Sequence, residues 1–180
     1  AEQVALARDS EFSSGLLPKE ALWWRSGRGG AEVAVWRPPQ VWRVALQLEA
    51  FQPPRRFALP MPGLVFVCAR SQPPAVFAAK RRPTSPEHLV YKAPLFNVFD
   101  SGLSCQGTHK YGQDVGQLPE EFFRAYFSHA GDGKGRSHKH PNGLLPLWEV
   151  LEGQAKSAND DLVEWGRVKY LLEGKYKSWR

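Results

Sequence analysis

Residues 64–80, LVFVCARSQPPAVFAAK, indicate the class of the fold. The first part, Leu64 to Ala69, is apolar throughout, which is typical of a central strand covered on both faces. The second part, Ala75 to Lys80, would pair with it across the turn Arg70 to Pro74. The stretch therefore predicts an antiparallel pair of buried strands near the middle of the chain.

Short β-favouring runs separated by turn residues precede this pair. They cover residues 21–25, 31–37 and 41–50, with SGRGG and then Pro38-Pro39 between them. Within the third run apolar and polar side chains alternate, as in a half-buried strand. The sequence thus predicts an antiparallel β-meander, and it leaves the first fifteen residues unassigned.

Helices are predicted only later in the chain. One would begin near Pro119, a favoured first-turn residue, with two glutamates suited to the positive end of the helix dipole. Another is indicated by caps from Ser157 and a stop at Gly174. Strands followed by helices favour an α+β domain in which helices pack on an antiparallel sheet. The aromatic residues expected to face that sheet from the first helix are Phe122, Phe123, Tyr126 and Phe127.

The composition is that of one globular domain, expected to span residues 1–180 with 152–180 as a C-terminal helical extension. The chain is 42% hydrophobic and 23% charged, with seven Trp and ten Phe to build a core. No apolar run approaches the ~20 residues of a membrane helix. The N-terminus lacks the basic-then-apolar order of a secretory signal, so we expect a cytoplasmic protein without membrane contact.

The net charge of +6 would suit nucleic acid or an acidic protein. The lysines and arginines are scattered rather than gathered in a stripe, which makes nucleic acid the less favoured partner. A basic nucleic-acid-binding protein stays open as a competing interpretation, and strongly salt-dependent retention on DNA would support it.

The two cysteines lie in different surroundings. Cys68 is inside the buried strand, where cysteine usually behaves as a small inert hydrophobe. Cys105 ends the aperiodic segment 81–105, and long ordered loops are disproportionately functional. Gly102 and Gly107 flank it and would leave its sulfur exposed. Cys105 is therefore a candidate nucleophile.

Residues 97–105, NVFDSGLSC, resemble the active-site segment of the E2 ubiquitin-conjugating enzymes. In that family a His-Pro-Asn turn leads through a glycine to the thioester cysteine. This chain keeps Asn97, Gly102 and Cys105 in the family's register, whereas Leu95 and Phe96 stand where conventional members have His and Pro.

This departure resembles a bacterial group, the prokaryotic E2-like family D, which is also known as protein B of the PRTRC cassette. That group lacks the His before the cysteine and has one after it, where His109 stands in this chain. The similarity covers residues 16–151. It implies an E2-like fold, with a β-meander, an active-site loop and then packed helices, and its catalytic residues would be Cys105, Asn97, His109 and Asp114.

The resemblance implies a conjugating enzyme. It would accept a ubiquitin-like protein from a ThiF-type, E1-like activating enzyme as a Cys105 thioester and pass it to an amine of a target protein. Asn97 would stabilise the oxyanion or hold the loop, His109 would activate the thiol or take a proton, and Asp114 would lie near the acceptor lysine. No cofactor is expected. A JAB-type peptidase in the same system and a role in antiphage defence follow by analogy only.

Other interpretations remain beside the enzyme. The missing His-Pro pair favours a catalytically silent module that binds the ubiquitin-like protein or scaffolds the activating enzyme. A zinc site is disfavoured, and no metal is expected, because no recognisable ligand pair occurs among the candidate ligands Cys105, His109, His129, His138 and His140. The run KGRSHKH, residues 134–140, could bind phosphate or an acidic partner, although such a run is usually a solvated face.

Overall fold

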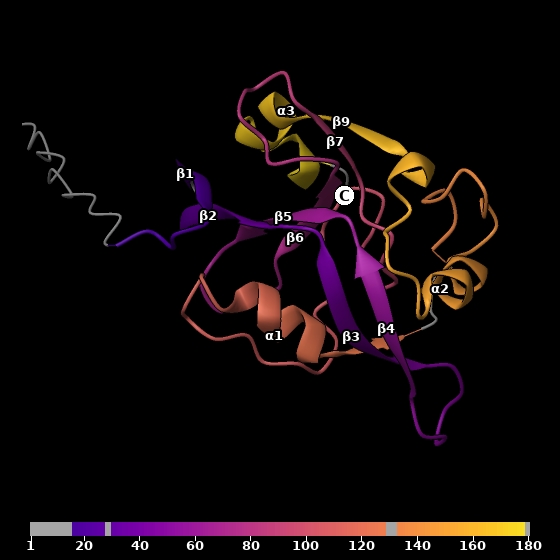
Figure 1. The fold of residues 1–180 in the computed structure, drawn as a ribbon. Coiled ribbons are helices and arrows are strands. Elements are labelled where there is room, and N and C mark those ends of the chain that lie inside the picture. The colour runs from indigo at the N-terminus through magenta and orange to yellow at the C-terminus, as the bar shows by residue number, and fades with distance from the viewer. Residues whose placement is uncertain (1–15, 28–29, 129–132, 179–180) are drawn as a thin grey trace, which may run out of the picture.

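The computed structural model describes residues 16–27, 30–128 and 133–178, and in them the expected α+β architecture is confirmed (Figure 1). The strands are β1 Ala21–Gly27, β2 Gly30–Arg37, β3 Gln40–Gln47, β4 Arg55–Met61, β5 Gly63–Cys68, β6 Ala75–Ala79, β7 Leu89–Lys92, β8 Tyr126–Ser128 and β9 Glu164–Arg167. The helices are α1 Leu118–Arg124, α2 Leu145–Leu151 and α3 Val168–Leu172, with short 3-10 turns at Asn159–Asp161 and Lys175–Lys177.

The strands form two sheets. A six-stranded sheet has the order β1-β2-β5-β6-β7-β9, and a three-stranded sheet has the order β4-β3-β8. The predicted pairing at the centre is confirmed, with Val65 opposite Phe77 in the antiparallel ladder of β5 and β6. The aperiodic segment 81–105 also contributes a strand, β7, which pairs with both β6 and β9.

Prolines divide what is otherwise one long antiparallel hairpin. The β2–β5 ladder ends with Arg37 opposite Leu64, and the β3–β4 ladder begins with Gln40 opposite Met61, in the same register. Between the two ladders lie Pro38-Pro39 on one side and Pro62 on the other, and proline has no N–H to donate. The hydrogen bonding is interrupted there, so β3 and β4 leave the main sheet as a projecting hairpin (Figure 1). The sequence prediction had no strand at β4.

Each face of the main sheet has its own core. Leu64 and Phe66 of β5 pack into a cluster with α1 and α2 residues, whereas Val65 and Val67 pack on the opposite face with residues of α3. Successive side chains of a strand point to opposite faces, so β5 is buried on both, as its uniform apolarity predicts. In Figure 1, α1 and α3 accordingly lie on opposite sides of the sheet.

The predicted C-terminal helix from Ser157 to Gly174 is wrong. The structure has strand β9 there, followed by the five-residue helix α3. An edge strand leaves backbone donors and acceptors unpaired, and β9 satisfies those of β7, with Val90 opposite Gly166. The extension 152–180 is therefore partly a sheet strand rather than a helical appendage.

The carboxylate of Glu32, which is 8% exposed, binds residues 176 and 177 to the first hairpin. Arg25 and Lys177 both form ion pairs with it, and the Tyr176 hydroxyl donates a hydrogen bond of 3.0 Å to it. Burial opposes the ionisation of Glu32, but the hydrogen bonds from Lys177 and Arg25 outweigh it, so the pKa of Glu32 is lowered. The segment after β9 is thereby held over the main sheet.

One aromatic residue near α1 does not face the core as expected. Phe122, Phe123 and Phe127 are buried, but Tyr126 is 65% exposed. The helix ends at Arg124, and Tyr126 opens strand β8, in which neighbouring side chains point in opposite directions. Tyr126 therefore lies on the outer surface of the small sheet while Phe127 lies inside.

Candidate functional site

The segment from Asn97 to Cys105 folds back on itself as a small hairpin. The Cys105 N–H donates to the carbonyl of Asn97 at 2.8 Å, and the Phe99 N–H donates to Leu103 O at 2.7 Å. Between them, Val98 and Ser104 form an antiparallel bridge. The predicted site residues Asn97 and Cys105 therefore lie directly opposite each other at the base of the hairpin.

This hairpin is fastened to strand β6 of the main sheet. The carbonyl of Gly102 accepts a hydrogen bond of 2.8 Å from Val76 N–H, and the Ser104 hydroxyl donates to Pro74 O just before the strand. Gly102 has φ +91°, a conformation that favours glycine, and it lies against the Phe77 ring. The position of Cys105 is thus set by the sheet core rather than by a free loop.

The thiol of Cys105 opens into a cleft of about 340 Å³. Cys105 is exposed, whereas Cys68 is completely buried, and burial raises the pKa of the Cys68 thiol well above its usual range. The predicted difference between the two cysteines is confirmed in their burial. The described residues lining the cleft are Phe96, Asn97, Val98, Phe99, Asp100, Cys105, Ser128, Gly133, Lys134 and Arg136.

The side chain of Asn97 joins the hairpin to strand β8. Its amide nitrogen donates to Tyr126 O at 3.0 Å, and its amide oxygen accepts from Ser128 N–H at 3.0 Å and from the Ser128 hydroxyl at 3.3 Å. Of its two expected roles, the contacts of the resting protein support the one of holding the loop. One amide hydrogen of Asn97 has no bonding partner among the described residues.

His109 lies against Tyr111 rather than against Cys105. The two rings are edge to face at 4.7 Å between centroids, and His109 Nε2 is 3.9 Å from Glu121 Oε2. Among the described residues, Nε2 has no hydrogen-bond partner. Burial, with the charges of Cys105 and Glu121, raises the pKa of Tyr111 to about 12.

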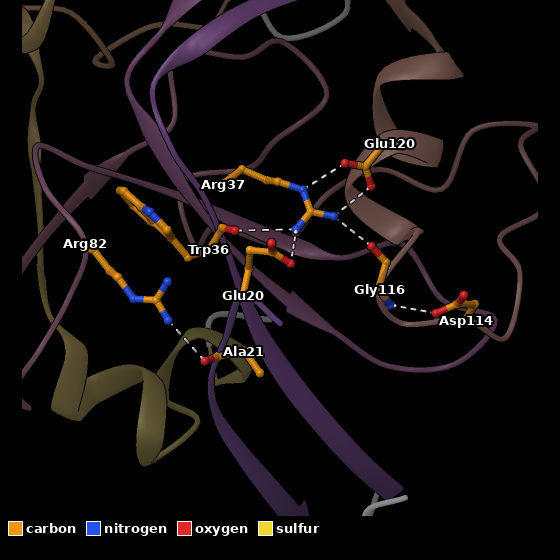
Figure 2. A network of polar contacts seen from close by, with 8 residues as sticks. All are labelled: Glu20, Ala21, Trp36, Arg37, Arg82, Asp114, Gly116 and Glu120. Carbon is orange, nitrogen blue, oxygen red and sulfur yellow. Dashed lines mark hydrogen bonds and ion pairs between the residues drawn. The ribbon is translucent and has the colours of Figure 1, made fainter. Parts of the chain in front are cut away.

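Asp114 lies outside the cleft, in a network of polar contacts before α1 (Figure 2). Its carboxylate accepts the Gly116 N–H at 2.9 Å, and the Gly116 carbonyl accepts a bond of 2.7 Å from Arg37. Arg37 also forms a bidentate pair with Glu120 at 2.8 and 2.9 Å. These contacts give Asp114 a structural task at the start of the helix, and the structure does not bring it to Cys105.

Three charged residues of the cleft, Asp100, Lys134 and Arg136, were not among the predicted site residues. Asp100 is the single carboxylate among the described lining residues. Its Oδ1 lies 3.2 Å from Lys92 Nζ and 4.0 Å from Arg136 Nη2. The aspartate belongs to the turn that carries the resemblance, which was the available signal. Arg136 belongs to the run interpreted as a solvated face, yet it is 6% exposed, so that interpretation is wrong at this residue.

Leu95 and Phe96, at the positions of the His-Pro pair, are core residues. Leu95 is fully buried, and Phe96 packs edge to face on Trp148 with 4.8 Å between centroids. The Trp148 indole N–H donates to Pro94 O at 2.9 Å. Helix α2 thereby supports the start of the hairpin through packing and one buried hydrogen bond.

No metal or membrane feature is found in residues 16–27, 30–128 and 133–178. These residues hold no group of three or more His, Cys, Asp or Glu that could bind a metal ion, and none of their helices is long and apolar enough to cross a bilayer. His129, one of the histidines weighed for zinc, lies outside the described residues.

Comparison with known proteins identifies a family. The family model of prokaryotic E2 family D matches residues 2–164, which include the whole hairpin and the cleft residues and end at the first residue of β9. Neither the curated proteins nor the solved structures contain a match to this chain.

Proposed function

The chain belongs to prokaryotic E2 family D, and from this premise we propose that it is a conjugating enzyme that carries a ubiquitin-like protein as a thioester on Cys105. The observation that carries the proposal is the placement of this thiol. It is exposed in a cleft, and its backbone N–H is bonded at 2.8 Å to Asn97 O, at the base of a hairpin anchored to the sheet. A carrier needs a reachable nucleophile in a fixed position.

The reaction would proceed in two exchanges. The Cys105 thiolate attacks the thioester carbonyl carbon on the activating enzyme, a new C–S bond forms, and the activating enzyme's cysteine leaves as a thiolate. An acceptor amine then attacks the same carbon, the C–S bond to Cys105 breaks, and the nitrogen loses a proton as the amide forms. Cysteine suits both steps because it is a good nucleophile and a good leaving group.

The neighbouring residues divide the remaining tasks. Asn97 is a positioning residue, since its amide bonds hold the hairpin on β8. His109 would act on the thiol through its neighbour Tyr111, whose pKa is raised in part by the charge of Cys105. Asp100 takes the place expected for Asp114 near the acceptor amine, because it lines the cleft and Asp114 does not. A carboxylate there would attract the protonated amine before it reacts.

The partners follow from the family and are proposed on that basis. They are an E1-like activating enzyme of the ThiF type, which would consume the ATP, a ubiquitin-like protein, and a target protein with an amine. We further propose a cytoplasmic bacterial setting, of the PRTRC kind, with a JAB-type peptidase in the same system and a role in antiphage defence. These settings rest on analogy alone.

A second function, a silent E2-like module, is favoured by one observation. Leu95 and Phe96 replace the polar His-Pro turn with buried apolar side chains, so no histidine shapes the hairpin from that side. Such a module would bind the ubiquitin-like protein or scaffold the activating enzyme without forming a thioester. The assay for the carrier separates the two functions.

Cys105 is expected to form a thiol-sensitive adduct with the ubiquitin-like protein when both are incubated with the activating enzyme and ATP-magnesium. Non-reducing gels should show an adduct that reductant removes, and Cys105→Ala should abolish it. Cys105→Ser should give an oxyester instead, which survives reductant and is cleaved by hydroxylamine.

Cys68→Ala is the matched control, because it removes the only other thiol from the core and leaves the cleft intact. We expect full adduct formation from this variant after a small loss of stability. An activating enzyme that is itself charged but transfers nothing to the intact protein would support the silent module. Binding of the ubiquitin-like protein would then be measured directly.

Asn97→Ala is expected to lower the free energy of unfolding by about 1–2 kcal/mol, because it removes the bonds that hold the hairpin on β8. Thioester formation should fall together with the stability. Ser128→Ala, which removes only the 3.3 Å hydroxyl bond, should change the stability and the thioester formation much less. Chemical denaturation and adduct assays measure the two effects. A large loss of adduct with unchanged stability would instead assign Asn97 to the oxyanion.

A further inference from the structure

The guanidinium of Arg136 is buried in the wall of the Cys105 cleft without adequate compensation. The side chain is 6% exposed, and its bonds to the carbonyls of Ala93 and Leu95 are long, at 3.4 and 3.3 Å. Its buried Nε has no hydrogen-bond partner among the described residues. Arginine stays protonated, and a buried cation is costly unless it is paired and hydrogen-bonded.

The nearby carboxylate does not remove this deficit. Asp100 Oδ1 is 4.0 Å from Arg136, the same oxygen is closer to Lys92 at 3.2 Å, and the Asp100 side chain is 68% exposed to solvent. Burial lowers the pKa of Arg136, and the Asp100 charge opposes this only in part. A purely structural arginine would be expected to make shorter hydrogen bonds from all the N–H donors of its guanidinium. The Arg136 guanidinium therefore keeps, in the wall of the cleft, an N–H donor that none of the described residues uses.

We propose that Arg136 forms an anion subsite of the Cys105 cleft, which binds the carboxylate of an acidic side chain next to the acceptor amine. The proposal rests on the proposed function and adds a substrate class to it. The cleft presents both charges that such an acceptor needs, Asp100 for the amine and Arg136 for the carboxylate, and Lys134 adds a second cation to the lining. When the acceptor enters, the long Asp100–Arg136 pair is exchanged for two shorter ones.

The size of the cleft suits an acceptor side chain. A space of about 340 Å³ has room for a few side chains, and Cys105 is among the residues that line it. A carboxylate held there lies beside the reacting atom, where a fork of N–H donors can fix the orientation of a peptide. An acidic residue in the tail of the ubiquitin-like protein is the other source of a carboxylate.

Alkylation of Cys105 tests the subsite without any partner protein. Iodoacetate and iodoacetamide transfer similar groups to a thiol, but only iodoacetate carries a carboxylate. We expect Arg136→Met to lower the ratio of their rate constants at Cys105 by about tenfold, since a charge-assisted hydrogen bond is lost. Cys68→Ala serves as the background, so that a single thiol reacts. Rates are followed by mass spectrometry.

Lys139→Met is the matched control, because it removes the same charge from an exposed residue of the same loop that does not line the cleft. Its ratio should stay at the parent value. If Arg136 were purely structural, Arg136→Met would change the iodoacetate and iodoacetamide rates together and leave their ratio unaltered, and that result would overturn the proposal.

If Arg136→Met does not fold, Asp100→Asn provides a second test, because it removes a negative charge from the cleft. The iodoacetate to iodoacetamide ratio should then rise severalfold, and an unchanged ratio would also overturn the proposal.

The source of the carboxylate is tested on the loaded thioester. Discharge to a peptide with aspartate beside its lysine should be about tenfold faster than to the matched alanine peptide, and Arg136→Met should abolish the difference. Equal discharge to both peptides in the intact protein would overturn the acceptor as source and leave the tail of the ubiquitin-like protein. Absence of any thioester would refute the proposed function, while the alkylation ratio would still decide the subsite.

Discussion

Replacing Gly102 by alanine is expected to lower the free energy of unfolding by about 3 kcal/mol or more, since overpacking and backbone strain add. Gly102 has φ +91°, and an added Cβ would lie 2.2 Å from two ring carbons of Phe77. Phe77 is itself fully buried against Trp165 and Tyr176, so it has little space to move. The hairpin that carries Cys105 would have to shift instead.

The effect on chemistry should exceed the effect on folding. Gly102 O accepts the Val76 N–H that fixes the hairpin on β6, so its displacement moves Cys105 relative to the rest of the cleft. Adduct formation measured where the variant is still folded should fall by about 10²-fold, the order expected for a misplaced reacting group. Urea denaturation and single-turnover loading measure the two quantities.

Gly107→Ala is the control for Gly102→Ala. Gly107 also has a positive φ, +55°, but an added Cβ would meet nothing within 4 Å. We expect a loss of only about 1 kcal/mol from the backbone conformation. Equal losses from the two substitutions would show that the contact with Phe77 does not hold the hairpin in place.

Replacing Trp148 by alanine is expected to cost about 3–5 kcal/mol, the range for removing a large buried aromatic residue. Trp148 is fully buried, and its ring packs edge to face on Phe57, Phe96 and Phe127. The loss also leaves Pro94 O without its hydrogen bond in the core. Because Phe96 lines the Cys105 cleft, loading should fall as well.

The same helix provides the control for Trp148. Val150→Ala, at a residue that is 58% exposed, should change stability by no more than about 0.5 kcal/mol. Trp148→Phe should cost less than Trp148→Ala, because it keeps most of the ring packing and loses the indole bond. Guanidinium denaturation of the three variants measures their free energies of unfolding and so ranks their stabilities. Equal stability of Trp148→Ala and Val150→Ala would contradict the proposed support of the hairpin by α2.

The predictable parts of the fold are those whose burial is the same at every residue or alternates regularly. The uniformly apolar stretch of β5 indicated a strand covered on both faces, and the proline and glutamates of its first turn indicated the start of α1. Strand β9 was taken for a helix because its few apolar residues fit a helical stripe equally well. Its pairing with β7 depends on an edge strand more than seventy residues earlier in the sequence, as the Leu89–Arg167 pair shows.

The sequence by itself determined the fold class and the contrast between Cys68 and Cys105, and the resemblance of residues 97–105 to the E2 active-site segment singled out Asn97. These depend on local periodicity, on turn residues and on a short segment with its own hydrogen bonds. Only the tertiary structure decided which charges line the cleft: Asp100 rather than Asp114, with Lys134 and the buried Arg136 from a run that was expected to be a solvated face. The burial of a polar side chain is set by segments distant in the sequence, so it leaves no local pattern to find.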